Sequence, residues 1–584
     1  MNKSSSTRAI KITIVFIFIA IGFVAFLSVM FYNSIKPRNI PSKFTYDSSY
    51  SQRGSIISED GFHLAVTQKL YKAIVNTKNI NPDKKDVFIK LFSIYSNIDP
   101  KIIEKKLNKR RGSVVLSYAI NPKEAQYLKS LAYELLAMKV FVEYETKSGR
   151  KILHGLNIIE SGERRIYPYK KLLTPLLGFP RKKEVKDYTK VYGVKGVEKF
   201  YEDDLHSMQD GYIRAPRDVN GHMILNKKSF VKFKQDGSDI VLNIPVTLQI
   251  KIEGILDNYK KKFDAKEVLA VIMESKSGKI KSLASSNRYL PTDIKKSEYT
   301  FLNNSAFEYS FEIGSVMKPI TFALLLEQGL VNPYDLVYVH NGRYKIGKKV
   351  ITDEHEYDWL SAENVIVHSS NIGTSIMAQK LHPIDFHSGL KKFGFSQKSK
   401  SDVYHEKRGS IPSIKKLHAA IYKATTSYGY GMRANLIQLV RAYNTFNNDG
   451  KLIKPLIVKK LITHNNKEIV FENIDEEQVI SPAVASKMKH ILIKTVLEGT
   501  GKNTIIDGLE IGGKTGTAHI AHRGKYVNRY NSSFIGFAND KSSKYTIGVT
   551  VVEPKKKYFA SQTAVVVFRD IVQQLVDDGL LVKR

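Results

Sequence analysis

The sequence predicts an α/β protein that is anchored in a membrane by one N-terminal helix. Three observations support this fold class. An uncharged apolar run lies near the N-terminus, strand-like segments occur in residues 268–284 and 533–552, and a long stretch with helical periodicity separates the two groups of strands. Strands that enclose helices in this way predict one large domain whose sheet is closed by segments distant in the chain.

The membrane helix is predicted over residues 12–32, which are 21 consecutive residues without a charge. This length spans about 30 Å of hydrocarbon as a helix. A cleaved signal peptide is the alternative, but its apolar core usually has only about 7–15 residues, and no small-residue cleavage site follows here. Basic residues precede the run and no acidic residue occurs before Asp47, which favours a cytoplasmic N-terminus, although Lys36 and Arg38 weaken that signal.

The remaining chain divides into segments that differ in composition and in hydrophobic pattern. We expect residues 1–11 to form a cytoplasmic tail, residues 33–52 a polar linker, residues 53–235 an N-terminal domain of short strands and helices, and residues 236–584 a larger C-terminal domain. In the last segment, residues 268–273 and 279–284 predict a β-hairpin around Ser-Lys-Ser-Gly. Helices are predicted over residues 434–446, after Ser481-Pro482, and over residues 563–575, with strands over 533–538 and 545–552.

The composition excludes several classes of protein. The 584 residues include 91 Lys and Arg against 56 Asp and Glu, a net charge of +35, and no cysteine. Without cysteine there is no disulfide framework, zinc finger, thiol enzyme or cysteine-bound iron–sulfur cluster. The positive charge first suggests nucleic acid, but it is spread along the chain without a basic stripe. We therefore expect no nucleic-acid partner.

Ser315-Val-Met-Lys318 is the first candidate for chemistry. If a helix starts at Ser315, the two side chains share a face, and a lysine with a lowered pKa can take the serine proton. Taken alone the pattern is weak, because five other serines have a lysine three residues later. For any one of them a solvated surface pair is the commoner explanation.

Ser369-Ser370-Asn371 and Lys514-Thr515-Gly516-Thr517 are the other two candidates. The first follows a segment with helical periodicity. Its hydroxyl can relay a proton and its carboxamide can align a substrate amide. Such residues more often form a turn at the end of a helix. The second suits an edge strand, where glycine lets a substrate backbone approach while lysine and two hydroxyls hold a carboxylate.

Two other sites are set aside. Residues 508–515 match the phosphate-binding pattern G-x-x-x-x-G-K-T, but no buried strand precedes them and no helix follows. His355-Glu356 lacks a second histidine at Trp359, so the zinc motif H-E-x-x-H is not formed. We expect no metal and no cofactor.

The order S-x-x-K, S-x-N, K-T-G is typical of β-lactamases and penicillin-binding proteins. With the segments starting at Arg53, Arg165 and Gly193, the chain resembles a class B penicillin-binding protein from about residue 45 to the end. The resemblance implies a transpeptidase fold, with a mostly antiparallel sheet flanked by helices and a helical subdomain, on an elongated α+β pedestal. The proline usual before Gly314-Ser315 is replaced by Ile313.

The resemblance also implies roles for the candidate residues. Ser315 would attack the bond between the terminal D-alanines of a peptidoglycan stem peptide, with Lys318 as its base. Ser369 would pass the proton to the departing D-alanine, and Asn371 would orient Lys318 and the donor amide. Lys514, Thr515, Gly516 and Thr517 would bind the terminal carboxylate, and Thr517 and Ser315 would supply the oxyanion hole.

The implied biology follows the family. The expected partners are stem peptides, β-lactam antibiotics, the inner membrane through residues 12–32, a polytopic glycan polymerase and divisome proteins. Asn371 favours a septal, division-type member over an elongation-type one, in which aspartate is frequent. An anchored β-lactamase or penicillin sensor, and a scaffold whose catalysis is dispensable, are the remaining alternatives. The catalytic part is expected on the periplasmic side.

Overall fold

A computed structural model describes residues 3–583, apart from residues 37–42, 110, 147–148, 150, 186–187, 219–221, 403–404, 473–475 and 524. Residues 1–2 of the predicted tail and 37–42 of the predicted linker, Arg38 among them, therefore lie outside the described residues. The chain forms two compact units, one of Met1–Tyr50 with Asp210–Lys234, the other of Ser51–Gln209 with Gln235–Arg584.

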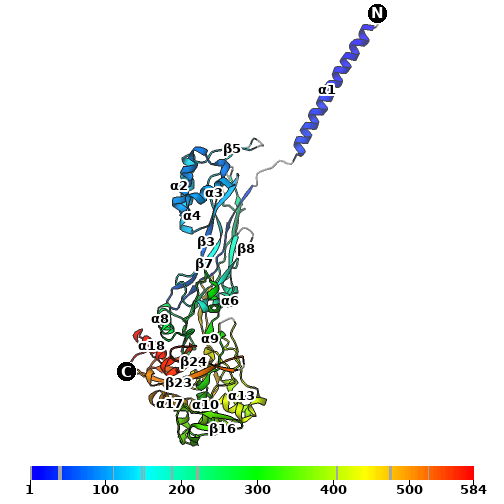
Figure 1. Ribbon diagram of the computed structural model, residues 1–584. Coiled ribbons are helices and arrows are strands. Elements are labelled where there is room, and N and C mark those ends of the chain that lie inside the picture. The colour runs from blue at the N-terminus through cyan, green and yellow to red at the C-terminus, as the bar shows by residue number, and fades with distance from the viewer. Residues whose placement is uncertain are drawn as a thin grey trace. The chain divides into compact units, whose positions relative to one another are not determined.

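The first unit contains the long N-terminal helix and a small sheet. Helix α1 covers Lys3–Ile35, and its segment Ser6–Ile35 is long and apolar enough to cross a membrane. Its most apolar stretch of 18 residues has a mean hydropathy of 2.9 and no buried side chains. The sheet has the order β1-β10-β11, formed by Phe44–Ser49, Gly211–Pro216 and Phe230–Lys232 (Figure 1). The predicted linker 33–52 is thus partly helix and partly strand. Its strand β1 pairs with β10, a segment far along the chain that no local pattern reveals.

The second unit begins with a nine-stranded sheet in the order β21-β20-β12-β2-β3-β7-β9-β8, with β4 also paired to β3. In chain order its strands are β2 Ile56–Ile57, β3 His63–Asn76, β4 Ser113–Ile120, β7 Asn157–Ile166, β8 Pro180–Val185, β9 Tyr188–Gly193, β12 Asp239–Leu242, β20 Val458–Ile462 and β21 Glu468–Val470. Strands from both sides of residue 235 share this sheet, so the predicted domain boundary there stays a prediction.

Three helices cover one part of this sheet. They are α2 Lys85–Ser96, α3 Pro100–Lys109 and α4 Pro122–Ala137. Their apolar faces and the inward side chains of β3 and β4 form a core of their own. Helix α4 starts with a capping box, in which Asn121 accepts from the backbone of Glu124 and the Glu124 carboxylate accepts from the backbone of Asn121.

The three N-terminal motifs of the sequence meet at one buried cluster. Arg53 and Arg165 both reach Glu198, with nitrogen–oxygen distances of 2.8 Å and 2.7 Å, and the Tyr167 hydroxyl donates to the same carboxylate at 3.2 Å. Burial raises the pKa of Glu198, but the charges of the two guanidinium groups outweigh burial and the net pKa is lowered. The cluster therefore links segments that are more than 140 residues apart.

The catalytic half of the unit is built on a five-stranded antiparallel sheet in the order β14-β13-β25-β24-β23. The strands are β13 Glu267–Glu274, β14 Ile280–Ser285, β23 Glu510–His522, β24 Lys525–Asn539 and β25 Lys544–Val552. The predicted hairpin and the two predicted C-terminal strands are confirmed. The sheet is closed by segments from both ends of this half, as the sequence predicts, and β23 lies at its edge.

Both faces of this sheet are buried because side chains alternate along each strand. Along β13, Val268, Ala270 and Ile272 pack with α8 Val246–Phe263 and α18 Ala564–Asp577 in one core. Leu269 and Val271 face the other core, which includes α10 Lys318–Glu327, α16 Leu436–Asn447 and α17 Pro482–Glu498 (Figure 1). The predicted helices are confirmed.

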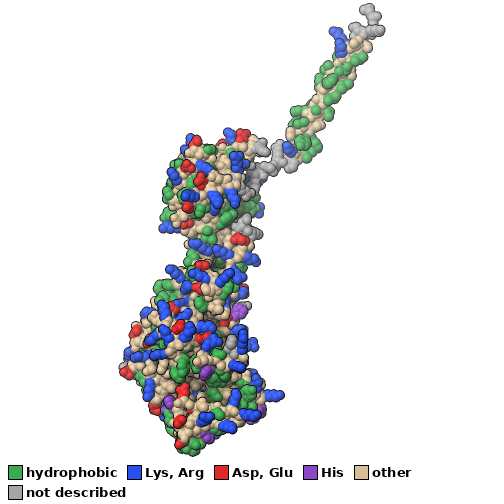
Figure 2. Space-filling view, in the orientation of Figure 1, with side chains coloured by type: hydrophobic (Ala, Val, Ile, Leu, Met, Phe, Trp, Pro, Cys, Tyr) green, Lys and Arg blue, Asp and Glu red, His purple; other side chains and the backbone are tan. Residues whose placement is uncertain are grey.

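The rest of the helical part consists of short helices between α10 and α16. They are α11 Ala362–Val367, α12 Asn371–Ala378, α13 Pro383–Lys392, α14 Ile414–Leu417 and α15 Ala420–Ser427. Lys and Arg side chains are scattered over the visible face instead of gathering in one stripe, while hydrophobic side chains occur along most of α1 (Figure 2).

Candidate active site

Ser315 lies on a tight turn that leads into a buried helix. A single 3₁₀ turn covers Gly314–Met317, and α10 begins only at Lys318. The sequence suggested that a helix starts at Ser315. In the structure, Ser315 instead lies on the turn that precedes the helix. Pro319 explains the break, because it has no N–H to donate and fits the first turn of α10. Ser315 is partly exposed, and its hydroxyl has no hydrogen-bond partner in the described part of the chain.

Glycines bring this turn against its neighbours. A methyl group on Gly516 of β23 would stand 2.9 Å from Val316 Cγ1 and 3.0 Å from the Ile313 carbonyl oxygen. A methyl on Gly429 would stand 2.1 Å from the carbonyl oxygen of Gly314. The sequence suggests that Gly516 leaves room for a substrate backbone, whereas in the structure the serine turn itself fills that space. The glycines thus hold Ser315 beside the edge strand.

Lys318 is fully buried and points to the end of α11. Its ammonium group contacts the backbone carbonyl of Ser369 and donates to Ser369 Oγ at 3.0 Å. Ser369 has a positive φ of 60°, the left-handed conformation that turns the chain between α11 and α12. The structure therefore brings the first and second motifs together.

Burial is the main cause of a strongly lowered Lys318 pKa, and the nearby charge of Lys514 lowers it further. The carboxylates of Asp353 and Glu354 oppose this shift without cancelling it. A lysine whose pKa is far below its usual value is a neutral amine over more of the pH range, so Lys318 has the property that a general base requires.

Asn371 is the first residue of α12, and its side chain does not bond Lys318. Its amide donates to the Thr352 carbonyl at 2.9 Å. The hydroxyl of Ser370 caps the same helix by accepting from the backbone of Gly373 at 2.9 Å. The expected orientation of Lys318 by Asn371 is thus absent among the described contacts, in which Ser369 holds the lysine. Asn371 remains a candidate for contacting substrate.

Lys514 lies on β23 and is also fully buried. Its ammonium nitrogen is 3.4 Å from the Thr515 carbonyl oxygen, and Thr515 Oγ1 is 2.6 Å from Thr500 Oγ1. Burial lowers the pKa of Lys514 to about 7, against the opposing charge of Glu354. Thr517 Oγ1 accepts from the backbone of Ala560 at 3.0 Å. The third motif therefore lies on an edge strand, as the sequence predicts, and this strand runs beside the serine turn.

Asp353 completes the site and was not predicted from the sequence. Its carboxylate accepts from the Ser370 hydroxyl and from the backbone N–H groups of Asn371, at 2.6 Å, and Ile372, at 3.1 Å. It therefore balances the partial positive charge at the N-terminal end of α12, where the second motif lies. No spacing or motif in the sequence distinguishes Asp353 from its acidic neighbours, so only the fold could identify it.

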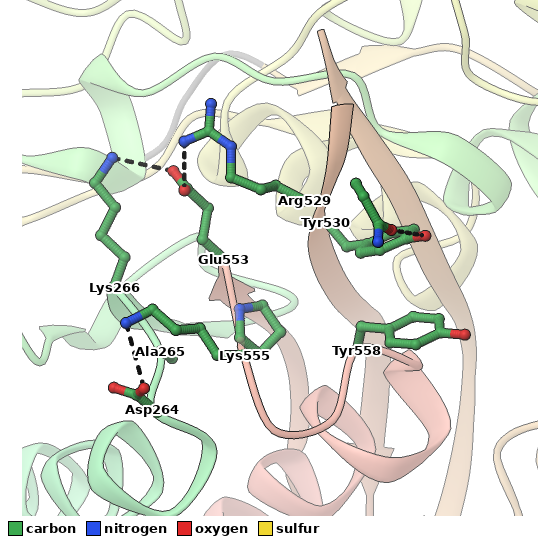
Figure 3. A pocket seen from close by; sticks show the side chains of 10 residues that line it. Asp264, Ala265, Lys266, Arg529, Tyr530, Glu553, Lys555 and Tyr558 are labelled. Atoms are coloured by element: carbon green, nitrogen blue, oxygen red, sulfur yellow. Dashed lines mark hydrogen bonds and ion pairs between the residues drawn. The ribbon is translucent and has the colours of Figure 1, made fainter. Parts of the chain in front are cut away.

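A hollow of about 520 Å³ opens at one end of the same sheet (Figure 3). Lys266 and Arg529 both pair with Glu553, at 3.1 Å and 2.9 Å, while the rings of Tyr530 and Tyr558 stack 4.5 Å apart. None of the predicted catalytic residues is among the described residues that line it. Within the described ranges, no group of three or more His, Asp or Glu residues is placed to hold a metal.

The chain has relatives among known proteins that match nearly its whole length. The model of the penicillin binding protein transpeptidase domain matches residues 268–573, and that of the penicillin-binding protein dimerisation domain matches residues 48–242. The chain is 26% identical to a peptidoglycan D,D-transpeptidase FtsI from Buchnera aphidicola, over 98% of this chain and 94% of the relative.

Solved structures share the fold. Penicillin binding protein 2X from Streptococcus thermophilus superposes with a TM-score of 0.76 at 20% identity, covering 92% of this chain and 81% of that one. A structure of penicillin binding protein 3 from Mycobacterium tuberculosis, complexed with aztreonam, has a TM-score of 0.65 at 20% identity and covers 92% and 98% of the two chains.

Proposed function

Because the chain belongs to the penicillin-binding protein transpeptidase family, we propose that it cross-links peptidoglycan stem peptides through an acyl group on Ser315. The observation that carries this proposal is the pair of buried lysines. Lys318 holds Ser369 on one side of the serine turn, Lys514 lies on the edge strand on the other, and both have lowered pKa values. This arrangement suits acyl transfer from a peptide that ends in a carboxylate.

In the acylation step, Ser315 Oγ attacks the carbonyl carbon between the two terminal D-alanines. Neutral Lys318 takes the hydroxyl proton as the new carbon–oxygen bond forms. The proton then passes through Ser369 to the nitrogen of the departing D-alanine as the carbon–nitrogen bond breaks. Lys514 and the hydroxyls of Thr515 and Thr517 hold the terminal carboxylate.

The negative oxygen that develops during the attack needs donors. The backbone N–H groups of Ser315 and Thr517 are our candidates, since the serine turn and β23 are in contact at Gly516. A donor of this kind contributes about 10²–10³ in rate. In the second step, an amine of a neighbouring stem peptide attacks the acyl carbon. The new carbon–nitrogen bond is the cross-link, and Ser315 is released. No step requires a metal or cofactor.

A β-lactam would acylate the same serine. Ser315 Oγ would attack the carbonyl carbon of the four-membered ring and break its carbon–nitrogen bond. The amine would stay attached to the acyl group, and it would therefore block access of the acceptor amine. We expect a long-lived acyl-enzyme, which would distinguish a transpeptidase from a β-lactamase.

The septal role is the favoured biological setting. The relative named FtsI matches almost the whole chain, and Asn371 is the residue typical of division-type members. We propose that α1 anchors the protein in the inner membrane with its catalytic part in the periplasm, where a polytopic glycan polymerase and divisome proteins are its partners. An elongation-type enzyme would instead give round cells on depletion, whereas a septal one gives filaments.

Labelling with a fluorescent penicillin tests the nucleophile. We expect the wild-type chain to label covalently and Ser315→Ala to lose the label completely. Ser388→Ala is the matched control, because Ser388 is an exposed serine with a lysine three residues later, on α13. Label that persists in Ser315→Ala would overturn the assignment. Full complementation of cell division by Ser315→Ala would instead support the scaffold alternative.

A further inference from the structure

A cavity of about 590 Å³ lies in the second unit, and the proposed mechanism does not use it. It is lined by residues 164–167 and Lys170 at the end of β7, by residues 180–182 of the edge strand β8, by Val191 of β9, and by residues 290–292. The first three groups belong to the N-terminal half of the chain, and the last follows β14 in the catalytic half. The cavity therefore lies where these two halves meet within one compact unit.

The lining is strongly basic. Five of its described residues are arginine or lysine and none is acidic. Arg165 is balanced by Glu198, and Arg164 donates to the amide oxygen of Gln68 at 2.8 Å. In the described part of the chain, no carboxylate pairs with the four side chains at the ends of β7 and β8, which are Arg164, Lys170, Arg181 and Lys182. Their mutual repulsion favours an anionic ligand.

Arg165 supplies a second, independent observation. Only 4% of its surface is exposed, and its Nη2 atom is buried with no hydrogen-bond partner among the described residues. A buried guanidinium N–H without an acceptor is unfavourable, and an oxygen of a bound anion would satisfy it.

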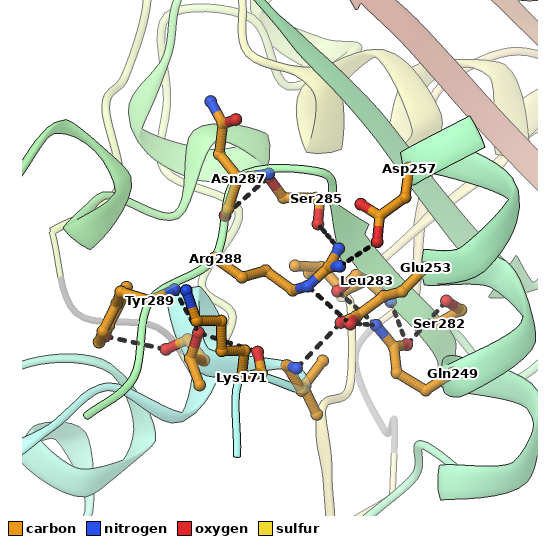
Figure 4. Close-up of polar contacts among 12 residues, drawn as sticks. Lys171, Gln249, Glu253, Asp257, Ser282, Leu283, Ser285, Asn287, Arg288 and Tyr289 are labelled. Atoms are coloured by element: carbon orange, nitrogen blue, oxygen red, sulfur yellow. Dashed lines mark hydrogen bonds and ion pairs between the residues drawn. The ribbon is translucent and has the colours of Figure 1, made fainter. Parts of the chain in front are cut away.

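The two sides of the cavity are held together by buried polar contacts (Figure 4). Tyr289, which precedes the 290–292 segment, donates through its hydroxyl to the Thr174 carbonyl at 2.9 Å. The carboxylate of Glu253 on α8 accepts from the Leu173 backbone at 2.9 Å and pairs with Arg288 at 3.0 Å. These contacts join the same two halves that line the cavity, so the cavity exists before a ligand binds.

We propose that this cavity binds a second stem peptide of the wall polymer through its carboxylates, apart from the peptide that reacts at Ser315. The proposal rests on the proposed function, which brings many such peptides to the protein on one polymer. Guanidinium groups match carboxylates with paired, parallel hydrogen bonds. Ile166, Leu290 and Pro291 give the cavity an apolar wall, and its volume lies within the range of pockets that bind small ligands.

The test uses the full chain in detergent after acylation by penicillin, which blocks Ser315 and independently tests the proposed function. A fluorescent stem peptide ending in D-Ala-D-Ala is titrated against it, and anisotropy is measured. We expect saturable binding that weakens as salt rises. Arg181→Gln should weaken it about tenfold. Lys183→Gln is the matched control, because it removes one charge from the same exposed strand but not from the cavity lining, and it should change the affinity less than twofold.

Several results would overturn the proposal. Penicillin-acylated protein that does not bind the peptide would refute it while leaving the catalytic assignment intact. Equal losses in Arg181→Gln and Lys183→Gln, or unchanged binding of a peptide whose carboxylates are amidated, would show that the cavity is not the site. Displacement by inorganic phosphate at the same concentration would indicate a general anion site. Tighter binding of an unrelated acidic peptide with the same number of carboxylates would indicate a protein segment as the ligand.

Discussion

Gly516→Ala changes the contact between the edge strand and the serine turn by a single methyl group. The added carbon would stand 2.9 Å from Val316 Cγ1 and 3.2 Å from the Val316 backbone nitrogen. Carbon atoms pack best at about 3.5–4.0 Å, so the Val316 side chain is roughly 0.6–1.1 Å too close. The turn and β23 must also separate to relieve the backbone contacts with the Ile313 oxygen at 3.0 Å and the Val316 nitrogen at 3.2 Å. Backbone atoms cannot rotate away as a flexible side chain does, and the strain falls on the segment that carries Ser315.

Two magnitudes follow from this separation. Overpacking of this kind costs about 1–3 kcal/mol of folding free energy. A displacement of about 1 Å at a reacting group costs about 10²-fold in rate. We therefore expect Gly516→Ala to lower the melting temperature and to slow acylation by fluorescent penicillin about 10- to 100-fold, measured on the same preparation by thermal unfolding and by the rate of label incorporation.

Gly254→Ala is the control for this prediction. Gly254 lies on α8 with open space around it, so alanine there should be neutral or stabilising by about 0.5–1 kcal/mol, without any effect on acylation. If Gly516→Ala acylated at the wild-type rate with an unchanged melting temperature, the turn and strand would not be in the contact described above, and the reasoning would be refuted.

Three further predictions concern charged side chains. The acylation rate should rise with pH through the lowered pKa of Lys318 and level off above it, because only the neutral amine accepts a proton. Lys514→Met removes a positive charge that lowers the Lys318 pKa, so the rise should move to higher pH. Asp353→Asn should cost about 1–2 kcal/mol in thermal unfolding and slow acylation, since α12 loses its charged cap, and an unchanged rate would contradict this. Glu198→Gln should cost about 3–5 kcal/mol, because buried Arg165 loses its counter-charge and buried Arg53 keeps only Glu202, and a melting temperature equal to the wild type would show the cluster to be dispensable.

Much of the fold could be predicted because its signals are local. Ser481-Pro482 predicts the start of α17, and in the structure Ser481 accepts from the backbone of Val484. Short runs rich in apolar and β-branched residues predict β13 and β25, which pair in the central sheet. Strand β1 inside the predicted linker has no such local signal, since it forms through its pairing with the distant strand β10.

The sequence by itself determined the chemistry available to this protein. It has no cysteine, and its three short motifs name the hydroxyls, the carboxamide and the two lysines of the site. Only the tertiary structure decided how these groups act. The burial that lowers the pKa of Lys318, the cap that Asp353 places on α12 and the basic cavity around Arg165 all depend on contacts between distant segments. Solvation and electrostatic neighbours are properties of packing, and the linear order of residues does not contain them.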